Sequence, residues 1–210
     1  MPKKNDREYR VMMLGIETRA EGDEPEKESM VVSGYASTFE EPYTLFEDRD
    51  IIIREVVDKE AFKNTDMSDV IFQYNHEGRV IARNSNNTLE VIPDEKGLFI
   101  KADLSGTELG RELYEEIRGG YTDKMSFGFT IDRIECTRTD LEDGRIDVLY
   151  RILGVSKLYD VSAVSIPAND GTSISVETRS QIDGVIEEAR AERLERAKVE
   201  LKKRLLKKEF

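Results

Sequence analysis

At 210 residues, the chain is long enough for one domain with a substantial hydrophobic core and additional terminal segments. Its net charge of −12 argues against nucleic acid as a main partner, because contacts to phosphate need a basic face. No apolar run approaches the roughly 18 residues of a membrane span. The chain has a single cysteine, which excludes an internal disulfide, and a single histidine, so a zinc site is not expected either. We therefore expect no membrane association, no metal and no cofactor.

The first half of the chain predicts mainly β-strands. Residues 1–6 are polar and are expected to be disordered. Beyond them, segments rich in apolar and β-branched residues alternate with polar connections, a pattern typical of strands joined by exposed loops. The predicted strands are 7–19, 29–39, 50–57, 70–74, 80–82, 89–92 and 98–104, with an acidic loop at 20–28 and an irregular connection at 40–49.

One helix is predicted inside the domain, at residues 107–118. Three apolar residues recur at four-residue spacing and so share one face: Leu109, Leu113 and Ile117. Thr107 is a suitable cap for the start of this helix, and Gly119-Gly120 is a suitable end.

Long strands follow the helix, at 125–138, 146–153 and 157–166, and the turn at 142–144 joins the first two. Together the elements predict an α+β fold. We expect a mostly antiparallel, closed β-barrel of about seven strands, with a few peripheral helices and a C-terminal helical tail. The barrel domain is predicted to span residues 7–178.

Residues 179–210 predict an amphipathic helical tail. Its apolar seam is interrupted by the segment RAER at 190–193, so a continuous coiled coil is not indicated. Residues 198–210 carry six basic and two acidic side chains, a local charge of +4 in an acidic chain. Two interpretations remain open: a solvated amphipathic tail, or a helix that docks on an acidic partner.

The chemistry of the chain centres on His76 and Ser126. A serine hydroxyl is a weak nucleophile at neutral pH until a neighbouring base removes its proton, and histidine is the side chain best suited to that task. Because the chain has a single histidine, only one such pairing is open. His76 follows a predicted strand, and Ser126 lies in the compact segment Met125–Phe129.

Five sequence blocks occur in a characteristic order. They are GYAS at 34–37, Asn75-His76, Gly97-Leu98, MSFGF at 125–129, and DVSAVSIPAN at 160–169. In this order and spacing they resemble the prohead proteases of tailed bacteriophages, which are related in fold to the herpesvirus maturation proteases. The resemblance implies that His76 is the general base and that Ser126 is the nucleophile.

The same resemblance places an acidic residue at Asp160 as the third catalytic member. Its role would be to accept a hydrogen bond from the His76 ring and to stabilise the imidazolium. Three other acidic residues are alternatives for this role: Glu77, Asp123 and Glu135. Backbone N–H groups near residues 165–171 are the expected oxyanion donors.

The resemblance also implies a biological role. It predicts a serine endopeptidase that cleaves scaffold and capsid protein segments, and itself, during prohead maturation. Its partners would be the phage major capsid protein and scaffold segments, with a homo-oligomer as a further option. Its location would be the assembling prohead in the host cytoplasm. Self-cleavage would remove the tail at residues 179–210. The alternatives are a catalytically inactive, scaffold-like assembly protein on the same fold, and a ligand-binding barrel in which Ser126 and His76 lie apart.

Overall fold

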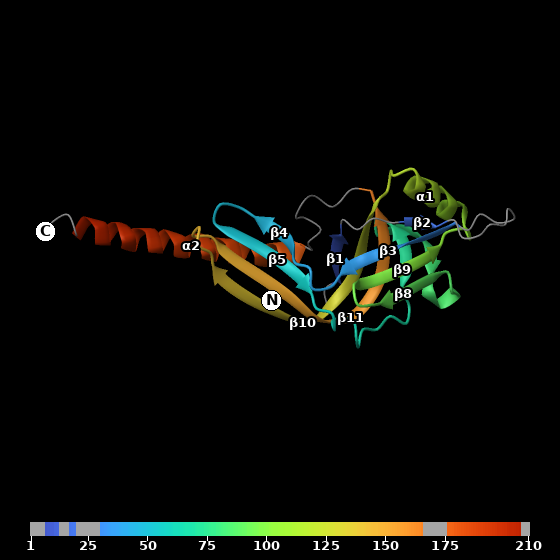
Figure 1. The fold of residues 1–210 in the computed structure, drawn as a ribbon, viewed down its shortest axis with the longest axis horizontal. Helices are drawn as coiled ribbons and strands as arrows, with labels where there is room; N and C mark the ends of the chain where they lie inside the picture. Colours follow the sequence, from blue (N-terminus) through green and yellow to red (C-terminus); the bar gives the residue numbers. More distant parts are fainter. Residues whose placement is uncertain (1–6, 13–16, 20–29, 166–175, 207–210) are drawn as a thin grey trace.

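The computed structural model describes residues 7–12, 17–19, 30–165 and 176–206 (Figure 1). The expected disorder of residues 1–6 therefore lies outside the described residues. The described elements are, in chain order, β1 (Arg7–Met12), β2 (Glu17–Arg19), β3 (Val31–Thr38), β4 (Tyr43–Glu47), β5 (Ile51–Val57), β6 (Ile71–Tyr74), β7 (Glu77–Arg83), the 3₁₀ turn η1 (Asn84–Asn86), β8 (Leu89–Pro93), β9 (Gly97–Asp103), α1 (Glu108–Arg118), β10 (Lys124–Asp140), β11 (Ile146–Val164) and α2 (Val176–Leu206).

The long antiparallel hairpin of β10 and β11 runs through the whole fold (Figure 1). Its turn is closed by Gly144, which has a φ of 83°, and by the Asp143 carboxylate, which accepts a hydrogen bond from the Arg145 backbone at 3.0 Å. The sequence predicted strands 146–153 and 157–166 as separate elements, whereas the structure has one continuous strand. Irregular register near Gly128 and Ile131 bends the hairpin without ending its pairing.

The described strands form two sheets and not the single closed barrel that the sequence predicted. One sheet has the order β1-β10-β11-β5-β4, with β6 and β7 alongside, and the other has the order β2-β3-β9-β8. The barrel prediction fails because β11 is long enough to pair with two strands in succession along one edge. Both β5 and β6 lie parallel to it, at residues 146–152 and 160–163 respectively. The α+β class is confirmed.

The main core lies between these two sheets. Alternating residues of each strand face inward, as a half-buried sheet requires. Fully buried contributors include Val32, Leu98 and Ile100 from one sheet and Phe72, Phe127 and Leu158 from the other.

Helix α1 adds its apolar face to the same core, as predicted. Leu113 and Ile117 are buried, whereas Leu109 stays 44% exposed. The predicted cap is present, because the Thr107 hydroxyl accepts a hydrogen bond from the Gly110 backbone N–H at 2.9 Å.

A second, smaller core lies in the arm, by which we mean β4, β5 and residues 134–152 of the hairpin. The sequence predicted an irregular connection where β4 forms. This strand arises because it pairs antiparallel with β5 across a turn in which the Asp48 carboxylate accepts hydrogen bonds from Asp50 and Ile51. The arm residues that form this second core are Leu45, Ile51, Ile53, Ile146 and Val148.

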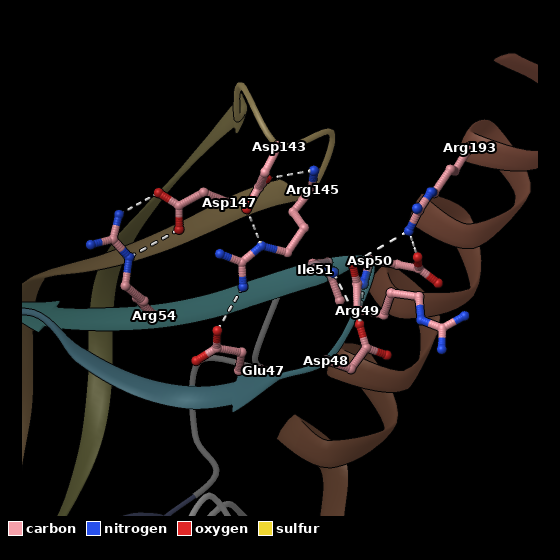
Figure 2. Close-up of polar contacts among 10 residues, drawn as sticks. All are labelled: Glu47, Asp48, Arg49, Asp50, Ile51, Arg54, Asp143, Arg145, Asp147 and Arg193. Carbon is pink, nitrogen blue, oxygen red and sulfur yellow. Dashed lines mark hydrogen bonds and ion pairs between the residues drawn. The ribbon is translucent and has the colours of Figure 1, made fainter. Parts of the chain in front are cut away.

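Helix α2 packs along the arm and projects beyond it (Figure 1). Ile182, Ile186 and Ala189 are buried against the arm core. At this contact, Arg193 of α2 pairs with Asp50 (Figure 2). On the arm itself, Arg145 bridges Glu47 and Asp143. The helix is thus docked on the arm between Ile182 and Ala189, while the domain limits at residues 178 and 179 stay predictions. Neither described helix has the length and apolar character that a membrane crossing requires.

Candidate active site

The turn between β6 and β7 presents His76. Asn75 and His76 both have left-handed backbone conformations, with φ of 51° and 59°, which cost free energy for residues other than glycine. The turn is held in place from β11 and its end: the Asn75 N–H donates to the Ala163 carbonyl at 2.9 Å, and the Asn75 side-chain oxygen accepts from the Ser165 N–H at 3.3 Å. The turn that carries His76 is therefore tied through Asn75 to the end of β11, the strand that carries Asp160.

Ser126 lies near the start of β10, opposite Ser162 of β11. Met125 and Phe127 point into the core, so strand alternation turns Ser126 to the opposite face, toward His76. The Ser126 Oγ lies 2.5 Å from the His76 Nε2. Although it is a polar side chain, Ser126 is fully buried.

Asp160 lies on β11 and is fully buried. Its Oδ1 contacts the His76 Nδ1 and also accepts a hydrogen bond from the Ser162 hydroxyl at 3.1 Å. Burial raises the pKa of the Asp160 carboxyl, but the hydrogen bond and charge of His76 and the charge of Arg7 outweigh it and hold the pKa below its ordinary value. The carboxylate therefore stays ionised at neutral pH.

The three other acidic candidates lie elsewhere. Glu77 is exposed at the start of β7, Asp123 pairs with Lys124 at 3.4 Å, and Glu135 is exposed on the arm. Of the four acidic residues that the sequence left open, the structure places Asp160 beside the imidazole. The predicted oxyanion segment, 165–171, lies outside the described residues except for Ser165.

The sequence did not predict that β1 contributes side chains to the candidate site. Arg7 forms an ion pair with the Asp160 Oδ2, and the Tyr9 ring packs edge-on against the His76 ring at 4.4 Å between centroids. β1 pairs antiparallel with β10, with Tyr9 opposite Gly128. The alternation of residues 7–10 could have indicated that Arg7 and Tyr9 share one face, but no sequence signal identifies β10 as the partner strand.

The contacts among Ser126, His76 and Asp160 form one chain of hydrogen bonds. With the Nδ1 proton directed to Asp160, the Nε2 of His76 is free to accept the proton of Ser126. This is the arrangement of the Ser–His–Asp triad of serine hydrolases. Among the residues that the structure describes, no group of three or more His, Cys, Asp or Glu side chains is placed to hold a metal ion.

Comparison with known proteins identifies the family. The chain belongs to the Caudovirus prohead serine protease family, whose model matches residues 15–185. Among solved structures, the bacteriophage T4 capsid assembly protease gp21 is similar, with 12% sequence identity and a TM-score of 0.41, covering 78% of this chain and 100% of that one. No curated protein matches the chain. The family match confirms the resemblance that the five sequence blocks indicated.

Proposed function

We propose that this protein is a serine endopeptidase with Ser126 as nucleophile, His76 as general base and Asp160 as the residue that orients the base. The observation that carries the proposal is the 2.5 Å approach of the Ser126 Oγ to the His76 Nε2, with Asp160 on the other ring nitrogen. Membership of a family of prohead serine proteases supports the same reaction.

In the proposed reaction, the Ser126 Oγ attacks the scissile carbonyl carbon while the His76 Nε2 takes its proton. The tetrahedral intermediate collapses when the imidazolium returns this proton to the departing amine, and an acyl-enzyme remains. Water then attacks the acyl carbon, again with His76 as base, and releases Ser126. The buried carboxylate of Asp160 stabilises the imidazolium in both halves of the reaction.

Access to the nucleophile requires a local movement. Ser126 has no exposed surface, and the His76 side chain is 16% exposed. A peptide carbonyl therefore reaches the Ser126 Oγ only after a neighbouring segment is displaced.

The proposed substrates are scaffold and capsid protein segments, and the proposed site of action is the prohead in the host cytoplasm. The C-terminal segment of the chain itself is a further proposed substrate. Leu194, Val199 and Leu201 of α2 are more than half exposed, and the last two lie beyond Arg196, which pairs with Asp140 of the arm. A catalytically inactive assembly protein on the same fold is the alternative. The ligand-binding alternative expected Ser126 and His76 to lie apart, and the structure has them in contact.

Intact-mass spectrometry tests the proposal. The full chain is expressed alone and with coat and scaffold protein, beside Ser126→Ala and His76→Ala variants. We expect time-dependent fragments of coat or scaffold, and loss of the C-terminal segment, with the parent chain but with neither variant. The fragment masses also give the cleavage specificity.

The exposed serine variant Ser68→Ala is the matched control, because Ser68 lies outside the candidate site. Stable masses for the parent chain in the presence of both partners would contradict the endopeptidase and favour the inactive assembly protein. An intact C-terminus beside cleaved scaffold would contradict only the self-cleavage.

A further inference from the structure

We propose that Arg7 is a positioning residue of the catalytic site, and that β1 is therefore a working part of the triad. The proposal rests on the function proposed above. Arg7 touches neither Ser126 nor the imidazole, so it would act through Asp160.

The two oxygens of Asp160 have different partners. Oδ1 is used by His76 and by the Ser162 hydroxyl, whereas Oδ2 pairs with the Arg7 guanidinium. Burying a carboxylate removes it from water at a large free-energy cost, which is offset when both oxygens have donors. Arg7 thus binds the second oxygen of the carboxylate and fixes the direction in which Oδ1 points.

Arg7 is itself held in place. Its guanidinium carbon lies 5.2 Å from the centroid of the Tyr9 ring and 4.7 Å from that of the Tyr159 ring. A planar guanidinium between two aromatic rings gains cation–π attraction and loses freedom to turn away. Since Tyr9 also packs against the His76 ring, one strand restrains both the carboxylate and the base.

Gly128 provides the space for this ion pair. An added Cβ would lie 2.3 Å from the Asp160 Oδ2, 2.9 Å from the Tyr9 ring and 3.1 Å from the Arg7 Nε. The glycine of the MSFGF block thus lies where Arg7 and Asp160 meet. Any side chain at this position would displace the carboxylate or the guanidinium.

The other face of β1 anchors the strand. Strand alternation directs Glu8 and Arg10 away from the site, and both are fully buried. Arg10 donates to both carboxylate oxygens of Glu55 on β5, at 2.5 and 2.8 Å, and to Glu8 at 2.9 Å. This two-pronged contact to β5 holds β1 in the register that brings Arg7 to Asp160.

The charge of Arg7 has a measurable consequence. The groups that face Asp160 are His76 from the β6–β7 turn, Arg7 and Tyr9 from β1, and Ser162 from β11. Without Arg7, the negative charge of Asp160 acts on the imidazole uncompensated and holds the imidazolium proton more tightly. The carboxyl also loses a contact that lowers its pKa. The first of these effects moves the acidic limb of the activity profile toward higher pH, because the imidazole must be neutral to act as the base.

The experiment compares full-length Arg7→Ala, Arg7→Gln and Arg7→Lys with the parent chain. We expect kcat on a scaffold-derived peptide to fall about tenfold to a hundredfold in Arg7→Ala, with little change in KM. The acidic limb of the pH profile should move to higher pH in Arg7→Ala and Arg7→Gln, and Arg7→Lys should restore it in part. Because the chain has one histidine, its imidazole gives a single NMR titration, which should move in the same direction.

Arg118→Ala, an exposed arginine of α1, is the matched control and should leave both readouts unchanged. The NMR titration decides: an unmoved midpoint in Arg7→Ala overturns the proposal, whatever happens to kcat. If Arg7→Ala does not fold, the comparison of Arg7→Gln with Arg7→Lys carries the same decision. Absence of any Ser126-dependent cleavage by the parent chain would contradict the proposed function alone, since the titration still tests Arg7.

Discussion

Gly128 lies so close to Asp160 that a Cβ on the glycine would come within 2.3 Å of the carboxylate oxygen. Real Cβ contacts are essentially never that short, so the two positions depend on each other. Gly128 is on β10 and Asp160 is its partner on β11 in the hairpin register. The pairing of the two long strands thus decides which carboxylate can lie beside His76.

We expect Gly128→Ala to lower kcat at least tenfold, because the methyl group would displace Asp160 from the His76 ring or expel Arg7 from Asp160. Steady-state kinetics on a scaffold-derived peptide measures this effect. Gly106→Ala is the control, because a Cβ at Gly106 meets no atom within 4 Å. Equal kcat values for the two variants would show that the site tolerates the methyl group.

We expect Asp160→Asn to lower kcat about ten-thousandfold, because an amide at this position no longer stabilises the imidazolium and favours the wrong tautomer of His76. Single-turnover kinetics checks this prediction with Asp160→Asn and the control Asp69→Asn, whose half-exposed carboxylate pairs with Arg83 outside the candidate site. A loss of less than tenfold in Asp160→Asn would exclude Asp160 as the third member and reopen the choice among the acidic residues.

Asp160 also makes stability depend on pH. Its pKa is lowered in the folded chain, so the ionised form stabilises the fold at any pH above the ordinary value of the carboxyl. As the pH falls through the lowered folded pKa, this contribution is lost. We expect the difference in unfolding free energy between the parent chain and Asp160→Asn to shrink as the pH falls through the range in which carboxyls titrate. Urea unfolding across this pH range measures it, and a gap that widens in acid would contradict the lowered pKa.

The buried cluster around Arg10 is expected to stabilise the fold. Arg10→Met removes the cation that pairs with the buried Glu55 carboxylate, at a cost of about 3–5 kcal/mol in unfolding free energy. Denaturant unfolding compares this variant with Lys63→Ala, which removes an exposed ion pair to Glu60 and should change stability little. Similar values for the two variants would mean that the buried cluster reorganises at low cost.

Docking of α2 depends on a few apolar side chains. Ile186 is 5% exposed in the arm core, and we expect Ile186→Ala to weaken the packing of the helix by about 2–4 kcal/mol. Hydrogen exchange of the α2 backbone amides should then become faster. Leu201→Ala is the matched control on the same helix, because Leu201 is 59% exposed and should leave exchange unchanged. Unchanged protection in Ile186→Ala would show that the ion pairs alone hold α2.

The sequence by itself determined the features of this protein that depend on local chemistry. The capped helix α1 follows from Thr107 and an apolar face at helical spacing, and most strands follow from β-branched residues between turn residues. The single histidine limited the choice of base to His76, and the ordered blocks indicated the protease family. The helix and strand predictions succeed because they depend on contacts between residues that are near in the chain, whereas His76 as the base stays a prediction.

Tertiary structure alone decided which distant strands lie side by side. The sequence predicted a closed barrel, whereas β11 takes two parallel partners along one edge and the described strands form two sheets. Arg7 reaches Asp160, 153 positions along the chain, only because β1 pairs with β10. Strand pairing over such distances depends on backbone hydrogen bonds and side-chain packing that many registers could satisfy, so the pattern of one strand does not identify its neighbour.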